Sequence, residues 1–214
     1  MPLPGREGHA ISRLTPVSAV LVVAMTVLQS AAVAAQSAWV ADPGIQRRLA
    51  VGEIVVQSAV DPEHPRARIR AAVRISAPAE TIWKIMTDCE QAQSFVPGLR
   101  RCRRVDGAAD GSWADIEHEV RYSWLLPSVD YVFRAHYDRP HRIDFRRISG
   151  DLKEEEGAWL LVPAAGAATI VEYEVYLDPG FWVPHFLVTR SLRKDLPAAL
   201  AGLRQRAENA AGGR

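Results

Sequence analysis

The sequence lacks most of the features that identify common classes of protein. It has two cysteines among 214 residues, so it is not a disulfide-rich scaffold. Its 26 Lys and Arg and 25 Asp and Glu nearly cancel, and without a basic excess we expect no binding to nucleic acid. No apolar run is as long as the roughly 18 residues of a membrane-spanning helix. The 48% hydrophobic content is too high for a disordered chain, which leaves a globular domain.

Signatures of catalysis and of cofactor binding are absent from the sequence as well. There is no G-x-S-x-G nucleophile motif, no glycine-rich phosphate loop and no dinucleotide-binding fingerprint. We therefore expect neither a cofactor nor a metal ion. Apart from His118, the histidines beyond residue 34 lack the spacing of metal ligands, and the two cysteines are 13 positions apart, which is not a metal-binding spacing either. These histidines are His64, His136, His141 and His185.

Residues 1–34 have the composition of a secretory signal. Arg6 and Arg13 precede a mostly apolar run from Val17 to Leu28, and small residues follow from Ala31 onward. A basic start, a short apolar core and an A-x-A pattern predict cleavage after residue 34 or 35. An uncleaved N-terminal anchor is the alternative. Export would place the protein in the periplasm or outside the cell, and the mature chain would carry equal numbers of acidic and basic residues.

Both cysteines, Cys89 and Cys102, lie in the part of the chain that is expected to be exported. An even number of cysteines in an oxidising compartment favours a disulfide between them. In the chain-entropy model such a bond contributes at most about 3 kcal/mol. Two buried free thiols are the alternative.

The rest of the chain predicts an α+β domain over residues 53–210, preceded by a flexible N-terminal segment at 35–52. Alternating and β-branched residues predict a hairpin of two strands, and Pro78 with the apolar spacing of Ile82 and Ile85 predicts a helix after it. A second short helix, six strands in a meander and a long amphipathic helix follow. Pro197 is expected to kink that last helix. The predicted strands are 53–60, 68–75, 99–105, 113–126, 129–137, 142–148, 157–162 and 169–177, and the helices are 78–88, 90–95 and 185–210.

The order of these elements predicts a ligand pocket. An antiparallel sheet must bury its apolar face, and the last helix is the only predicted element long enough to cover it. A strongly twisted sheet wrapped around one helix tends to leave a cavity between them. Such a cavity is a site for a small molecule.

Several motifs carry a resemblance to one family. They are the run from Ile75 to Asp88, Phe95-Val96-Pro97-Gly98-Leu99, Gly150-Asp151 followed by Trp159, and Pro179 to Pro184 leading into Leu192 to Pro197. In this order they resemble the START-like polyketide cyclase/dehydrase family, also called SRPBCC, over about residues 69–207. The resemblance implies the helix-grip fold, a curved antiparallel sheet around a long C-terminal helix. Family members include coenzyme-Q-binding proteins, lipid-transfer START domains and aromatic polyketide cyclases.

Residues on the inward face of the predicted sheet are the candidates for contact with a ligand. His118 is either a hydrogen-bonding or acid–base group in the pocket, or a core histidine satisfied by a neighbouring strand. Arg147 either meets a ligand carboxylate or phenolate, or is solvated where the strand pattern slips near its end. The aromatic candidates either line an aromatic or isoprenoid pocket or pack the core; they are Tyr122, Trp124, Tyr131, Phe133, Tyr137 and Tyr173.

Two surface features are candidates for transient contact with a membrane. One is an arginine-rich strand around Cys102, which either attracts an anionic surface or keeps an edge strand from pairing; it contains Arg100, Arg101, Arg103 and Arg104. The other is an apolar cluster where the chain enters the last helix. If it is exposed, it forms a lid over the ligand or a tip that touches a membrane; if it is buried, it is a staple that fixes the end of the helix. The cluster consists of Phe181, Trp182, Val183 and Phe186, of which the first two are also candidate ligand contacts.

The sequence thus favours an exported protein that encloses a hydrophobic small molecule, such as a lipid, quinone or isoprenoid. The second hypothesis is a cyclase or dehydratase that uses His118 or a pocket tyrosine as its acid–base group. The third is an interaction domain whose cavity is filled by its own aromatic side chains. Convergence of His118, a tyrosine and Arg147 in a deep pocket would favour catalysis, whereas a purely apolar tunnel would favour carriage of a ligand.

Overall fold

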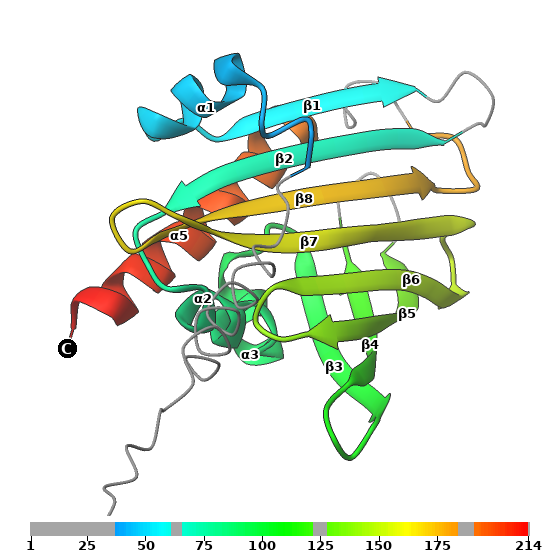
Figure 1. Cartoon of the computed structure of the whole chain (residues 1–214). Helices are drawn as coiled ribbons and strands as arrows, with labels where there is room; N and C mark the ends of the chain where they lie inside the picture. The colour runs from blue at the N-terminus through cyan, green and yellow to red at the C-terminus, as the bar shows by residue number, and fades with distance from the viewer. Residues whose placement is uncertain (1–36, 61–65, 122–127, 184–190, 214) are drawn as a thin grey trace, which may run out of the picture. The chain divides into compact units, whose positions relative to one another are not determined.

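The strands of the chain form a single antiparallel sheet in a computed structural model that describes residues 37–60, 66–121, 128–183 and 191–213. Within these residues the sheet has eight strands in the order β1-β2-β8-β7-β6-β5-β4-β3, and Figure 1 shows its curvature. The predicted hairpin and the six-strand meander are both present, and β8 pairs with β2 to join them. The strands are β1 (Val55–Val60), β2 (Ala67–Ile75), β3 (Leu99–Gly107), β4 (Trp113–Val120), β5 (Val129–Asp138), β6 (Arg142–Gly150), β7 (Glu154–Ala164) and β8 (Ala168–Asp178).

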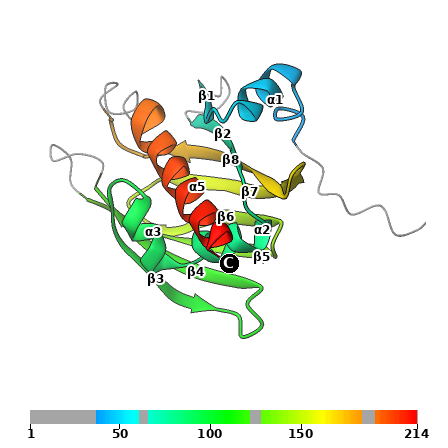
Figure 2. The ribbon, with the colours of Figure 1, turned by 90° about the vertical axis from the view of Figure 1, so that its left-hand side faces the viewer.

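Among the described residues, three helices cover the concave face of the sheet: α2 (Ala79–Met86), α3 (Cys89–Phe95) and α5 (Leu196–Gly212). Figure 2 shows α5 crossing in front of the strands with α3 beside it. The apolar stripe of α5, Leu200, Leu203 and Ala207, is buried against inward residues of β2 and against α2. The prediction that the last helix packs across the sheet is confirmed.

The start of the C-terminal helical region is irregular. A π-helical turn, η1 (Ser191–Asp195), directly precedes α5, and Pro197 occupies the first turn of α5. Proline has no N–H to donate and its ring crowds the preceding turn, so it favours an irregularity at this point. The structure thus has a change of helix type just before Pro197, and the predicted kink itself stays a prediction. Residues 185–190 of the predicted helix lie outside the described residues.

The N-terminal segment packs against the sheet, which corrects the prediction of a flexible stretch at 35–52. Asp42 accepts hydrogen bonds from the backbone N–H groups of residues 44 and 45 and so caps helix α1 (Pro43–Ala50). Ile45 and Leu49 are buried against the convex face, opposite α5. The pair Pro43-Gly44 resembles a loop signal, but proline after an N-cap aspartate is a favoured start of a helix.

Candidate functional site

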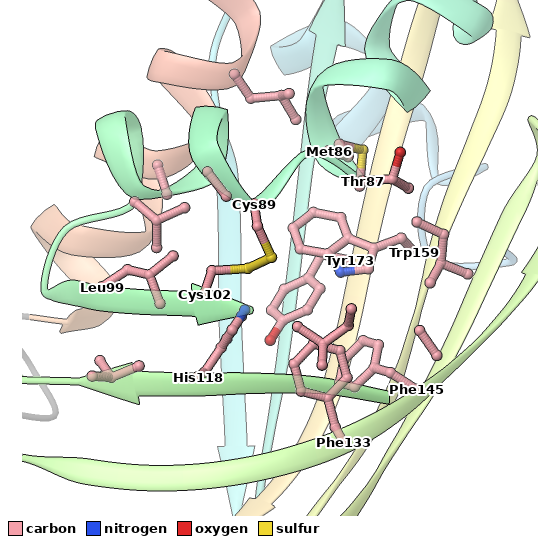
Figure 3. A pocket seen from close by; sticks show the side chains of 18 of the residues that line it. Met86, Thr87, Cys89, Leu99, Cys102, His118, Phe133, Phe145, Trp159 and Tyr173 are labelled. Atoms are coloured by element: carbon pink, nitrogen blue, oxygen red, sulfur yellow. A yellow bond between two sulfur atoms is a disulfide. The ribbon is translucent and has the colours of Figure 1, made fainter. Parts of the chain in front are cut away.

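A pocket of about 330 Å³ lies between the concave face of the sheet and helices α3 and α5. Its wall is mostly apolar, as expected for a site that takes a hydrophobic molecule. Strand residues such as Ile116 and Phe145 form the floor, and Phe95, Leu200 and Leu203 come from the helices. Figure 3 shows this lining from close by. The cavity predicted from the order of the elements is therefore present.

Aromatic rings form one continuous side of the pocket. Phe133 meets Phe145 edge-on at 6.1 Å between ring centroids, and Phe145 stacks on Tyr173 at 6.1 Å. Tyr173 in turn contacts Trp159 at 4.2 Å. The predicted inward aromatic residues Tyr131, Phe133, Tyr137 and Tyr173 all line the pocket, although their contact with a ligand stays a prediction.

The other aromatic candidates are not placed in the pocket. Tyr122, Trp124 and Phe186 lie outside the described residues. Phe181 and Trp182 follow the end of β8 and do not line the pocket, contrary to their selection as ligand contacts. These two residues are 41% and 81% exposed, so neither of them is buried as a staple.

His118 lies in the pocket wall. It lies on β4 beside Tyr131 of β5, with its Nδ1 atom 3.3 Å from the tyrosine hydroxyl. Its ring also meets Phe133 edge-on at 4.9 Å. Burial lowers the pKa of His118 to about 4, because the charged imidazolium loses its hydration. His118 therefore faces the pocket and has a partner on the neighbouring strand, while an acid–base role stays a prediction.

A disulfide joins Cys89, the first residue of α3, to Cys102 of β3. Both cysteines line the pocket, and Cys102 is directly opposite His118 in the β3–β4 register. Figure 3 shows the sulfur–sulfur bond beside His118. The bond fixes the start of α3 to an edge strand, so it holds together two elements that border the pocket.

Arg147 lies at the edge of the site rather than in its lining. Its position opposite Phe133 puts it on the concave face, but an irregularity between residues 132 and 133 shifts the strand register there. The Nη2 atom donates a hydrogen bond to the backbone oxygen of Gly150 at 2.7 Å. Arg147 is therefore half-buried and bound to the backbone rather than fully solvated, and its contact with a ligand stays a prediction.

Glu155 is a pocket residue that the sequence reasoning missed. Strand β7 begins at Glu154, three residues earlier than predicted, and Glu155 lines the pocket. Burial raises the pKa of Glu155 to about 8, while the charge of Arg147 acts in the opposite direction. The run of three glutamates at 154–156 suggests a solvated turn. The signal that could have revealed Glu155 is its shared parity with Gly157 and Trp159 along the strand.

Comparison with known proteins then decides the family. The sequence model of the family described as polyketide cyclase/dehydrase and lipid transport matches residues 75–204. The chain belongs to this family. No curated protein matches the chain.

Solved structures of START and cyclase proteins have the same fold as this family member. A STAR-related lipid transfer protein from Xanthomonas axonopodis is 18% identical and superposes with a TM-score of 0.62, covering 72% of this chain and 93% of that one. Human StAR-related lipid transfer protein 5 is 11% identical with a TM-score of 0.61, covering 74% and 83%. The Zhui aromatase/cyclase from a Streptomyces species is 14% identical with a TM-score of 0.56, covering 67% and 94%. At these identities the likeness establishes the START-like helix-grip fold.

The arginine-rich strand of this START-like domain is an edge strand. β3 is the last strand of the sheet, and two of its arginines pair with acidic residues of β4 and β5. Arg101 lies within 4 Å of Glu117, Glu119 and Asp130, and Arg103 pairs with Glu117. Charged side chains of this kind keep an exposed edge from pairing with another sheet.

The described part of this START-like chain offers no cluster of three His, Cys, Asp or Glu side chains that could hold a metal ion. None of its described helices is both long enough and apolar enough to cross a membrane.

Proposed function

We propose that this protein binds a single hydrophobic small molecule, a lipid, quinone or isoprenoid, between its sheet and α5. The observation that carries the proposal is the apolar pocket of about 330 Å³ lined by aromatic and aliphatic side chains. Burial of apolar ligand surface contributes roughly 25 cal/mol per Å² before the costs of association are subtracted. The START-related lipid transfer proteins with the same fold support a ligand of this class.

The direct test is to purify the protein from its own host and examine it by native mass spectrometry and by organic extraction. A bound apolar molecule, released on denaturation, is the expected result. Uptake of the apolar dye Nile red by delipidated protein gives a second readout. Repeated recovery of empty protein that takes up no dye would contradict the proposal.

We further propose that the protein acts outside the cytoplasm, in the periplasm or as a secreted protein. Two features support export: the signal-like composition of residues 1–34, and the Cys89–Cys102 bond, since such bonds persist in oxidising compartments. Cell fractionation with a C-terminal tag tests the location. Recovery of full-length protein with free thiols from the cytoplasm would contradict it.

Transient contact with a membrane is a further part of the proposal. Phe181 and Trp182 form an exposed apolar tip after β8. Co-sedimentation with vesicles of phosphatidylcholine and phosphatidylglycerol is expected to fall for Trp182→Ser. Val51→Ser, which changes an equally exposed residue elsewhere, is the control. Equal sedimentation of wild type and Trp182→Ser would contradict a role for the tip.

A cyclase or dehydratase is the second candidate, and the pairing of His118 with Tyr131 in the pocket favours it. A general base works best when its pKa lies near the working pH, whereas the pKa of His118 is about 4. Binding is therefore the better-supported function. Turnover of an aromatic polyketide substrate that is lost in His118→Gln would reverse this order.

A further inference from the structure

A buried glutamate lies on the convex face of the sheet, on the side opposite the pocket. Glu172 of β8 is 3% exposed and is paired with Ala72 of β2. Because side chains alternate along a strand, it shares its face with Ile170, which packs in the same cluster as Leu49 of α1. The hydroxyl and the backbone N–H of Ser37 both donate hydrogen bonds to its carboxyl group. Glu172 therefore lies where the N-terminal segment meets the sheet.

The carboxyl group of Glu172 has no cationic partner among the described residues. Its Oε1 atom is buried and makes no hydrogen bond to any of them. The next glutamate on the same face, Glu174, pairs with Arg68 and Arg70 of β2. A buried carboxylate is costly unless a cation or hydrogen-bond donors compensate its charge, and a buried oxygen without a donor is uncommon. Burial accordingly raises the pKa of Glu172, while the hydrogen bonds from Ser37 act in the opposite direction.

The amino terminus of the exported chain is a cation that lies close to this oxygen along the sequence. The expected cleavage after residue 34 or 35 leaves an α-ammonium group one or two residues before Ser37. Backbone bond lengths keep successive nitrogen atoms within about 4 Å of each other, and every second one within about 7 Å. The new ammonium group is therefore within this reach of the Ser37 nitrogen that donates to Glu172. In the uncleaved chain the same nitrogen belongs to a neutral peptide bond.

We propose that Glu172 binds the α-ammonium group that signal cleavage creates, so that the mature chain gains an ion pair that its precursor cannot form. The inference rests on the proposed export and is independent of the molecule in the pocket. An ammonium group has three N–H donors, so it can donate to Oε1 while Ser37 keeps its own hydrogen bonds. At a buried carboxylate the attraction is screened less by water than in a surface pair.

Chemical labelling of the α-amino group tests this ion pair on the exported protein, purified from outside the cytoplasm. N-terminal sequencing and the intact mass first establish which residue begins the chain. The rate of acylation by an N-hydroxysuccinimide ester at neutral pH is then followed by peptide mass spectrometry. Only the unprotonated amine reacts, and a carboxylate partner keeps it protonated. Glu172→Gln is expected to be labelled about tenfold faster than wild type, which corresponds to a change of about one unit in the pKa of the amine.

A second variant moves the amino group and leaves the domain unchanged. A short Gly/Ser insertion directly after the observed cleavage site carries the ammonium group away from Glu172, and it is expected to be labelled as fast as Glu172→Gln. If Glu172→Gln does not fold, this insertion still decides the question. The matched control is Glu174→Gln, which removes a carboxylate two residues away on the same face and is expected to be labelled at the wild-type rate.

The possible failures are distinguishable. A chain that is cleaved after residue 34 or 35, but is labelled at the same rate in wild type and in the insertion variant, would overturn the inference and leave export intact. A blocked amino terminus, or one at another residue, would also overturn the inference. Recovery of the uncleaved chain from the cytoplasm would overturn the proposed export together with it. Binding of Nile red in the pocket is expected to be the same in all of these variants.

Discussion

His118 and Tyr131 face each other across β4 and β5, with the histidine Nδ1 atom 3.3 Å from the tyrosine hydroxyl. The contact gives the neutral imidazole a polar partner inside an apolar wall. It does not compensate for the loss of hydration on protonation, and burial lowers the pKa of His118 to about 4. The pair therefore supplies the pocket with neutral hydrogen-bonding groups at neutral pH.

The lowered pKa of His118 makes folding stability depend on pH. Between pH 6.5 and about 4 the unfolded chain binds a proton at this residue that the folded chain does not. The contribution of His118 to the free energy of unfolding is therefore complete above pH 6.5 and is lost as the pH falls toward 4. We expect the free energy of unfolding, measured with urea at several pH values in this range, to depend less steeply on pH in His118→Gln than in wild type. The same dependence on pH in the two proteins would contradict a buried neutral histidine.

Glu155 is expected to act in the opposite direction. Its pKa rises from an ordinary value of 4.5 to about 8, so between these values the folded chain binds a proton that the unfolded chain has lost. Its contribution to stability is complete below pH 4.5 and declines as the pH rises through 8. Glu155→Gln, which stays neutral, should be more stable than wild type at pH 9, and Glu154→Gln should not be. A Glu155→Gln variant less stable than wild type at pH 9 would contradict this account.

Much of the fold follows from local patterns in the sequence. The alternation of Ile69, Ala71 and Val73 and the helical spacing of Leu200 and Leu203 predict strand β2 and helix α5, since each pattern matches the period of its element. The order of the elements then leads to the pocket. These are the features that short-range periodicity encodes most directly.

The parts that the sequence did not predict depend on signals with two interpretations. Pro43-Gly44 fits a loop as well as the start of a helix, and burial of Leu49 against the sheet decides between them. The three glutamates at 154–156 fit a solvated turn as well as the start of a strand, and the pairing of Glu155 with Leu177 decides for the strand. The exposure of Trp182 likewise depends on long-range packing that spacing does not report.

The N-terminal segment is expected to contribute to stability, because Leu49 is only 1% exposed beneath α1. Leu49→Ala should lower the free energy of unfolding by about 2–5 kcal/mol, the usual cost of truncating a buried leucine. Val51, in the turn after the helix, is 82% exposed, so Val51→Ala should change stability by less than about 0.5 kcal/mol. Equal stability of the two variants, measured by urea unfolding, would show that α1 does not pack on the sheet.

The Cys89–Cys102 bond is expected to stabilise the pocket border. Its loop spans 13 positions, and the chain-entropy model gives a contribution of about 3 kcal/mol. The free energy of unfolding of the double variant Cys89→Ser/Cys102→Ser, measured with urea, should be lower by this amount. The variant should also show faster amide exchange in α3. The remainder of the sheet serves as the internal control for exchange. Unchanged exchange in α3 would contradict its role as the element that the bond fixes.

The pocket itself can be tested by filling it. Ala199 lines the cavity, while its neighbour Ala198 on the same helix is exposed. The most direct measurement is Nile red binding by Ala199→Trp and Ala198→Trp, with circular dichroism to show that both are folded. The account predicts that a folded Ala199→Trp loses dye binding at least tenfold while Ala198→Trp binds like wild type. Equal binding by the two folded variants would show that the dye does not enter the space between the sheet and α5.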